Sequence, residues 1–396
     1  MTMPKTTPFS KNVQRMLGSS TFKAAQAAAD LRDEGYKVID LTVGEPDFDT
    51  PEFIKQYAWE GLQKGITKYT PPPGLFAFRE SVADFYADEY GTTFSPQEVA
   101  ATCGGKQALF NAITTLVNAG EEVLIPKPFW VTFPEIVNFC GGTNVYIDTE
   151  NTDFILTSEQ VKEAITGKTK LLIVNSPNNP TGRVIPPGEM RKIVDVCVEN
   201  EVYVLTDECY LLFVYPPEKA FTSASLPKEY RDFVCVAGSF SKTYAMTGWR
   251  IGYTITSESW TNQMTKLQGH SASHPTSFVQ YACAKAMENR EESLSAVNSM
   301  LDEYKKRRDW FIPALQEIEG LKVAKPEGAF YAFVDVRDLL GDKFATSADF
   351  CEQLLHKSQV VITDGKGFGA DGFVRLSYAT SMENLKTAVR KLEDIV

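Results

Sequence analysis

The segment LLIVNSPNNPTG, residues 171–182, decides the fold of this 396-residue chain. Four consecutive apolar residues, Leu171 to Val174, lead into a polar string rich in asparagine and proline. A short apolar run bounded by turn residues is typical of a strand that is buried on both faces, as in a parallel sheet. The loop after such a strand lies at the carboxyl edge of the sheet, where open α/β sheets bind their ligands. The segment therefore predicts an α/β fold and the edge at which the binding site lies.

The rest of the chain continues this pattern. Further short apolar runs, each expected to be a strand, are found at 122–125, 202–205, 233–236 and 251–254, and helical patterns occupy 107–117 and 188–199. Strands that alternate with helices predict an α/β domain with a mostly parallel sheet.

The two ends of the chain differ from this middle part. The segment 279–317 is charged and helical, and we expect its charge run at 303–308 to be a solvated helix face that bridges to a last domain. That domain is expected to hold strands at 329–336, 360–363 and 373–377 and helices at 347–356 and 382–392. An arm, a helix at 21–34 and a strand at 38–41 are expected near the N-terminus.

Charge and composition exclude several classes of protein. The chain is 43% hydrophobic and 23% charged, with a formal net charge of −11. An acidic chain without a basic block is not suited to nucleic acid or to an anionic membrane. No stretch approaches the roughly 18–20 apolar residues of a membrane helix, and the polar N-terminus lacks a signal-peptide core. We expect a cytoplasmic protein with neither nucleic acid nor membrane as a partner.

Cysteine and histidine spacing argues against a metal site. The seven cysteines are scattered, odd in number and never spaced as CxxC, which favours reduced thiols. His270 and His274 are four residues apart, but no cysteine or carboxylate accompanies them. We therefore predict no bound metal.

A lysine follows the strand predicted at 233–236, in the string Ser239-Phe240-Ser241-Lys242. At the end of a buried strand its amine can be buried, which lowers a lysine's pKa and prepares it to form a Schiff base. A solvated loop lysine is the competing interpretation. Arg250 is either part of a structural ion pair or a bidentate anion ligand.

Two more segments carry candidate chemistry. Asp207 follows the strand predicted at 202–205, and a carboxylate there must be paired or solvated. It is either an exposed helix cap or the partner of a protonated heterocycle nitrogen, with Tyr210 donating to a ring oxygen. Gly104 and Gly105 open a predicted helix, where they form either a simple turn or an anion site built from backbone amides.

Taken in order, these segments resemble the class I aminotransferases of the fold type I pyridoxal-phosphate enzymes, and most closely the bacterial aspartate aminotransferase subgroup. The resemblance rests on the strings GEPDF, GGKQAL, NSPNNPTG, KTYAMTGWRIGY and VRLSYATS, at residues 44–48, 104–109, 175–182, 242–253 and 374–381. It implies an α/β fold with a large domain, whose mostly parallel seven-stranded sheet binds pyridoxal 5′-phosphate (PLP), and a smaller α+β domain built from both chain ends. We predict an N-terminal arm at 1–20, a small domain at 21–45 and 290–396, and a large PLP-binding domain at 46–289.

The resemblance also implies residue roles. Lys242 forms the Schiff base and shuttles the proton, Asp207 keeps the pyridine nitrogen protonated, and Tyr210 bonds the ring's phenolic oxygen. The implied cofactor-binding residues are Tyr69, Gly104, Gly105, Lys106, Trp130, Asn179, Asp207, Tyr210, Ser239, Lys242 and Arg250. The implied substrate-binding residues are Gly44, Lys106, Trp130, Asn179 and Arg375. Tyr69 resembles the tyrosine that reaches the phosphate of a neighbouring subunit, which implies a homodimer with shared active sites.

The implied activity is a ping-pong transfer of an amino group between an L-amino acid and 2-oxoglutarate. Aspartate is the preferred candidate donor, with aromatic or prephenate-type donors also considered, and Lys106 is the candidate cation for a distal carboxylate. A lyase of the same fold would share the lysine and the aspartate. A PLP-binding regulator would carry a DNA-binding domain ahead of the fold, whereas about twenty residues precede the first predicted helix.

Overall fold

The computed structural model describes residues 9–396 apart from 19 and 219, so part of the arm predicted at 1–20 lies outside the described residues. The helices are α1 Lys11–Gln14, α2 Ser20–Asp33, α3 Glu52–Gln63, α4 Phe76–Tyr90, α5 Gly105–Leu116, α6 Thr132–Cys140, α7 Ser158–Ala164, α8 Pro187–Glu199, α9 Phe240–Thr243, α10 Glu258–Gly269, α11 Ser277–Glu288, α12 Arg290–Gln316, α13 Ser347–Ser358 and α14 Met382–Glu393. The strands are β1 Ile39–Asp40, β2 Val99–Thr102, β3 Glu122–Lys127, β4 Thr143–Asp148, β5 Thr169–Asn175, β6 Tyr203–Asp207, β7 Val234–Ser239, β8 Gly252–Ile255, β9 Lys322–Val323, β10 Tyr331–Asp335, β11 Val360–Val361, β12 Thr363–Asp364 and β13 Phe373–Ser377.

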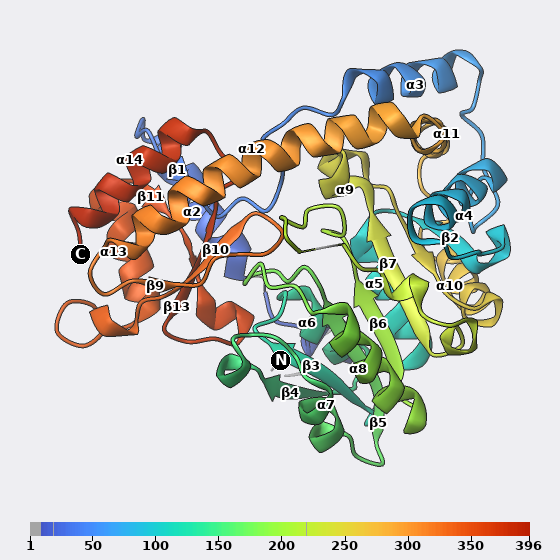
Figure 1. Ribbon diagram of the computed structural model, residues 1–396, viewed down its shortest axis with the longest axis horizontal. Coiled ribbons are helices and arrows are strands. Elements are labelled where there is room, and N and C mark those ends of the chain that lie inside the picture. The colour runs from blue at the N-terminus through green and yellow to red at the C-terminus, as the bar shows by residue number, and fades with distance from the viewer. Residues whose placement is uncertain (1–8, 19, 219) are drawn as a thin grey trace, which may run out of the picture.

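The large domain is built on a seven-stranded sheet of order β2-β8-β7-β6-β5-β3-β4. Strand β8 pairs antiparallel with both β2 and β7, and the other neighbouring strands pair parallel. In β5, Leu171 and Ile173 pack in the core that contains α5, whereas Leu172 and Val174 pack in the core that contains α8. Both faces of the sheet are therefore covered by helices, which confirms the predicted α/β fold with a mostly parallel sheet (Figure 1).

The small domain holds an antiparallel sheet of order β12-β13-β10-β9. Strand β1, from the N-terminal part of the chain, pairs parallel with β11 from the C-terminal part. The long helix α12 runs between the two domains (Figure 1). Both ends of the chain thus contribute to the small domain, while the residue boundaries predicted for the domains remain a prediction.

Two expectations about the segment 279–317 are wrong. It forms two helices rather than one, because Asn289 leaves the helical conformation (φ −87°, ψ 65°) and its side-chain amide bonds Glu292 and Tyr57. Asparagine readily makes such local bonds at helix ends. The charge run is also not solvated throughout, since Arg307 and Arg308 are 6% and 4% exposed.

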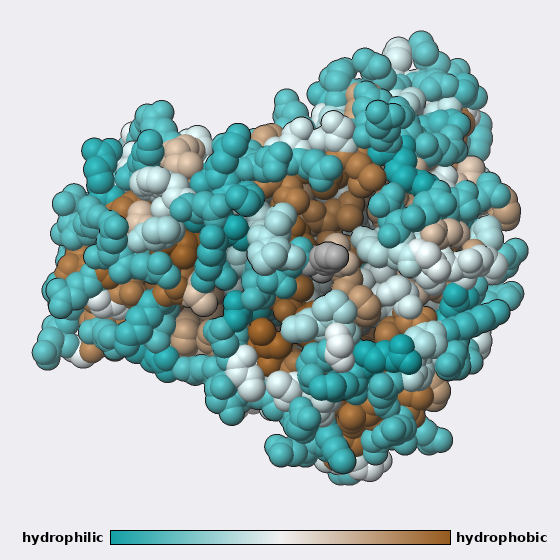
Figure 2. All heavy atoms as spheres, in the orientation of Figure 1, coloured by the Kyte–Doolittle hydropathy of each residue, from teal (hydrophilic) through white to brown (hydrophobic). Residues whose placement is uncertain are grey.

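Arg307 and Arg308 are buried because α12 crosses from one domain to the other and is covered along one face. Arg307 pairs with both carboxylate oxygens of Asp47, at 2.8 and 2.9 Å, and with Glu303 at 3.2 Å. A buried guanidinium with such partners is stable in a place where an unpaired one would not be. On the face shown in Figure 2, hydrophilic residues cover most of the surface, and hydrophobic ones gather in the hollow beside α12.

Candidate active site

A cavity of about 360 Å³ lies at the carboxyl ends of the central strands, and residues of both domains line it. It is lined by Thr42, Gly44, Gly105, Lys106, Leu109, Trp130, Asn175, Asn179, Asp207, Cys209, Tyr210, Ser239, Ser241, Lys242, Arg250, Tyr331 and Arg375. The structure therefore brings together every predicted site residue except Gly104 and Tyr69.

Adjacent strands of the parallel sheet place the polar residues at one edge. Asn175 ends β5 and lies opposite Asp207, which ends β6. The Asn175 amide donates to the Asp207 carbonyl at 2.9 Å, and its side-chain oxygen accepts from the Asn179 backbone N–H at 2.8 Å. One buried asparagine thus fixes the loop that carries Asn179 relative to the aspartate.

The third strand end supplies the lysine. Ser239 ends β7, and its hydroxyl caps the short helix α9 by accepting from the Ser241 N–H at 3.1 Å. Lys242 lies on this turn and donates to the backbone carbonyl of Gly44. Burial lowers the pKa of the Lys242 amine. In the described part of the chain this lysine forms no ion pair, so its amine is a candidate nucleophile.

An anion cradle forms between the start of α5 and the end of β7. The first amides of a helix have no partner within the helix, and those of Gly105 and Lys106 begin α5 here. A Cβ atom at Gly104, whose φ is +81°, would lie 2.6 Å from a guanidinium nitrogen of Arg250. Gly104 therefore admits Arg250 to the cradle without lining the cavity itself.

The buried carboxylate of Asp207 forms no ion pair within 4.0 Å among the described residues. The Asp207 side chain accepts from the Cys209 N–H at 3.2 Å. Burial raises the pKa of Asp207 to about 6, although hydrogen bonds from Cys209 and the charge of Lys242 oppose this. Such a carboxylate suits a ligand that brings its own basic nitrogen.

Arg375 is a buried cation that, like the carboxylate of Asp207, forms no ion pair among the described residues. It lies on β13, is 4% exposed, and donates to the Asn179 side chain at 2.9 Å and to the Thr42 carbonyl at 2.7 Å. Its Nε has no partner, and no acidic side chain of the described residues pairs with it. The guanidinium lies over the ring of Tyr331, 4.5 Å from the ring centre. An anionic ligand group would satisfy this arginine.

The remaining predicted residues line the walls. The hydroxyls of Tyr210 and Tyr331 are 2.7 Å apart, and both rings are buried. The amine of Lys106 lies over the face of Trp130 at 5.0 Å, at the exposed mouth of the cavity. Partial burial and the charge of Arg250 lower the pKa of Lys106.

Tyr69 lies outside the cavity and is 92% exposed, with its ring edge-on to His274. Six further residues line the cavity that were not predicted from the sequence: Thr42, Leu109, Asn175, Cys209, Ser241 and Tyr331. Asn175 and Cys209 could have been found, because they adjoin predicted residues at strand ends. Tyr331 gave no such signal, since it lies in the apolar run of β10 and resembles an ordinary core aromatic.

These residues fit the predicted cofactor. PLP carries a phosphate, a basic ring nitrogen and an aldehyde, and the cavity offers an anion cradle, an unpaired buried carboxylate and a buried amine.

None of the helices in the described residues has the length and apolar character needed to cross a membrane. The described residues also contain no group of three His, Cys, Asp or Glu side chains that could hold a metal ion.

Comparison with known proteins identifies the family. A family model described as aminotransferase class I and II matches residues 36–392. A probable aspartate/prephenate aminotransferase of Aquifex aeolicus is 39% identical over 96% of this chain and 96% of its own length. Aromatic-amino-acid aminotransferase 2 of Thermococcus litoralis is also 39% identical, over 91% of this chain and 92% of its own.

A solved structure agrees with these relatives. The aspartate aminotransferase from Thermus thermophilus with maleate matches with a TM-score of 0.94 and 36% identity, covering 99% of this chain and 100% of that chain. The chain therefore belongs to the aminotransferase class I and II family, and it is an aminotransferase that uses pyridoxal 5′-phosphate.

Proposed function

We propose that this enzyme transfers an amino group between an L-amino acid and 2-oxoglutarate, with Lys242, Asp207 and Arg375 as its principal residues. One observation carries the proposal: the buried Asp207 and Arg375 and the partly buried Lys242 surround one cavity, and none of the three has an oppositely charged side chain within 4.0 Å among the described residues. Unpaired buried charges are costly for a fold and are typical of functional sites. Neither a lyase nor a regulator is favoured by the family relatives.

Each residue has a chemical task in this proposal. PLP supplies an electron sink for the substrate's α-carbon when it is bound. Asp207 keeps the ring nitrogen protonated, and Lys242 binds the cofactor covalently and moves the proton at the α-carbon. Tyr210 and Asn179 hold the ring oxygen, and Trp130 covers a ring face.

The cofactor phosphate and the substrate carboxylate have separate binding groups. The amides of Gly105 and Lys106, together with Ser239 and Arg250, hold the phosphate, and Gly104 leaves room for that arginine. Arg375 holds the α-carboxylate, with help from Asn179 and the backbone of Gly44. The two arginines thus divide the two anions between them.

Aspartate is the proposed preferred donor. The Aquifex and Thermus relatives are named for aspartate, and the second is solved with maleate, a dicarboxylate. Lys106 is a cation at the cavity mouth that could meet a distal carboxylate, since it has no acidic partner in the described residues. Aromatic and prephenate-type donors are also proposed, because Trp130 offers an aromatic face and the Thermococcus relative is named for aromatic amino acids.

The enzyme is further proposed to be a cytoplasmic homodimer. The exposed Tyr69 supports shared active sites, because its ring lies outside its own cavity and is free to meet the phosphate bound by a partner subunit.

The test is a half-reaction. Each amino acid of a panel is added alone to the PLP-loaded enzyme, and the absorbance of the bound cofactor is followed. The expected result is conversion by aspartate and return of the original spectrum with 2-oxoglutarate. A panel that yields elimination products without this return would contradict amino transfer.

A further inference from the structure

The segment 325–329 of the small domain joins two loops of the large domain, and we call this contact the interdomain joint. One of these loops contains residues 178–184 and the other residues 213–215. The backbone amides of Glu327 and Gly328 donate to the Gly182 carbonyl at 2.9 and 2.8 Å. Tyr215 N–H donates to the Glu327 carbonyl at 2.8 Å, and Ala329 N–H donates to the Phe213 carbonyl at 2.8 Å.

Glu327 and Tyr215 each use both backbone and side chain across the domain boundary, and Glu327 is the charged one of the two. Its carboxylate accepts from the Arg183 guanidinium at 3.0 Å and from the Val184 N–H at 2.9 Å. Arg183 also pairs with the exposed Asp153. The carboxylate thus holds the segment after Gly182 at two points.

Close packing leaves the joint little freedom. A Cβ atom at Gly182, whose φ is +68°, would lie 2.6 Å from the side chain of Pro326 and 2.8 Å from the carbonyl of Gly328. A Cβ atom at Gly328 would lie 2.7 Å from Pro177. The backbones at these two glycines are therefore packed too closely against their neighbours to admit a side chain.

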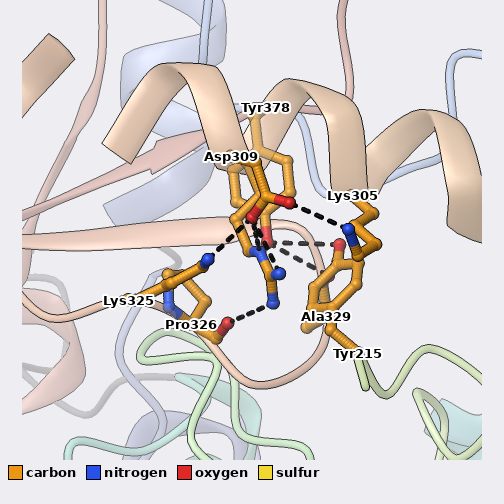
Figure 3. A network of polar contacts seen from close by, with 8 residues as sticks. Tyr215, Lys305, Asp309, Lys325, Pro326, Ala329 and Tyr378 are labelled. Atoms are coloured by element: carbon orange, nitrogen blue, oxygen red, sulfur yellow. Dashed lines mark hydrogen bonds and ion pairs between the residues drawn. The ribbon is translucent and has the colours of Figure 1, made fainter. Parts of the chain in front are cut away.

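The far side of the joint is fixed by α12. Arg308 donates to the Pro326 carbonyl at 2.9 Å and lies over the ring of Tyr215, 4.1 Å from the ring centre. Figure 3 shows Lys305 and Lys325 converging on Asp309, and the tyrosine hydroxyls beside the Ala329 carbonyl.

The joint connects the two residues proposed to hold the substrate carboxylate. The 178–184 loop carries Asn179, and the 325–329 segment leads directly into β10. Phe333 of β10 is paired with Arg375 of β13. The Asn179–Arg375 hydrogen bond of 2.9 Å therefore closes a ring of contacts whose other side is the joint.

We propose that Glu327, with Arg183, is a positioning residue that sets Asn179 against Arg375 and so shapes the α-carboxylate site. This inference rests on the proposed role of Arg375. Every amino donor carries an α-carboxylate, so the joint affects the binding of all donors equally. Lys106, in contrast, is proposed to affect only donors with a distal carboxylate.

The experiment is a double-mutant cycle in the PLP-loaded enzyme with Glu327→Ala, Arg183→Ala and the double variant. We expect each single change to raise KM for aspartate and for phenylalanine by the same factor, about tenfold, with kcat nearly unchanged. The double variant should be no worse than the worse single variant, since both changes break one contact. Cofactor retention, followed by its absorbance after gel filtration, should equal that of the wild type.

Two controls make the outcome decisive. Asp153→Asn removes the exposed partner of Arg183 and should leave KM unchanged. Arg375→Ala tests the proposed function separately: if it raises KM while both joint variants do not, only this inference fails. Loss of cofactor together with kcat in the joint variants would show a merely structural role and would also overturn it. If Glu327→Ala does not fold, Arg183→Ala alone decides.

Discussion

Arg375 and Arg308 are equally buried, each 4% exposed, yet their surroundings are opposite. Among the described residues, Arg375 has only neutral acceptors, Asn179 and the Thr42 carbonyl, and its Nε has no partner. Arg308 bonds the Asp309 carboxylate at 2.8 and 3.1 Å and the Pro326 carbonyl. The partners of a buried charge, and not its burial, therefore distinguish a binding group from a structural one.

The neighbouring carboxylates show the same contrast. Burial raises the pKa of Asp207 to about 6, because it outweighs the hydrogen bonds from Cys209 and the charge of Lys242. Burial acts in the same direction on Asp309, but hydrogen bonds from Lys325, Lys305 and Arg308 outweigh it and hold the pKa well below its usual range. The cavity keeps its charges unpaired for ligands, whereas the charges of Arg308 and Asp309 on α12 are paired within the protein.

Replacing Lys242 by alanine should have the largest effect. Its buried amine has no substitute among the residues lining the cavity except Lys106 at the mouth. We expect turnover to fall by at least about a thousandfold, measured as kcat with aspartate and 2-oxoglutarate. Lys305→Ala, which removes a lysine of α12 that is paired with Asp309, is the control and should keep turnover. A near wild-type rate for Lys242→Ala would refute the assignment.

Asp207→Ala should come next, with kcat lower by about a hundredfold to a thousandfold while the cofactor still binds. The carboxylate stabilises positive charge at the ring nitrogen, and the cavity has no other acid in that place. The measurement is single-turnover conversion with aspartate alone. Asp309→Ala should reduce thermal stability instead, and an unchanged kcat in Asp207→Ala would make both aspartates structural.

The two arginines provide the direct test of the comparison. Arg375→Ala should raise KM for amino donors by about a hundredfold and leave the apoenzyme's stability unchanged or higher, because an unpaired buried charge is removed. Arg308→Ala should lower the free energy of unfolding by about 2–4 kcal/mol, since Asp309 loses a partner. Denaturant unfolding and steady-state kinetics on both variants suffice, and exchanged outcomes would contradict the distinction.

Sequence alone predicted the cofactor side of the site better than the joint. Asp207 ends a buried strand, and Asn179 and Lys242 lie within four residues of the end of one, so their common edge follows from the parallel sheet. Arg375 lies within an antiparallel strand, and only the family resemblance identified it. The residues around Arg375 in the sequence give no information about which loop its strand faces.

The joint could not be predicted from local pattern. Arg307 and Arg308 lie in a run of charges, and such runs are usually solvated, but α12 presents them to Asp47 and Tyr215, which are distant in sequence. Tyr331 resembled a core aromatic in the sequence because the residue that its hydroxyl contacts, Tyr210, lies more than a hundred residues away. Tertiary contacts decided all three cases.

Lys106→Ala should separate substrates rather than abolish activity. A charge-assisted contact contributes roughly 1.5–3 kcal/mol, so kcat/KM for aspartate should fall by about tenfold to a hundredfold. An aromatic donor should be nearly unaffected, because it has no distal carboxylate. Equal losses for both donors would show that Lys106 supports the phosphate cradle instead.

The smallest effect concerns pH, and it tests the contrast between the two aspartates in the apoenzyme. The folded-state pKa of Asp207, about 6, lies above the ordinary value near 4, so the folded chain holds the extra proton between these values. Stability should therefore fall as pH rises from about 4 to 6, with a slope of at most about 1.4 kcal/mol per pH unit. Asp207→Asn removes this slope. Titration of Glu208, whose pKa burial raises to about 7, is shared by the wild type and the variant and cancels in the difference between them.

The contribution of Asp309 to stability has the opposite pH dependence. It is complete above about pH 4 and is lost only as pH falls further through the lowered pKa of this carboxyl. Asp309→Asn should thus differ from wild type by a constant amount between pH 4 and 6. A constant difference for Asp207→Asn over the same range, measured by urea unfolding, would mean that its carboxylate is not held unpaired.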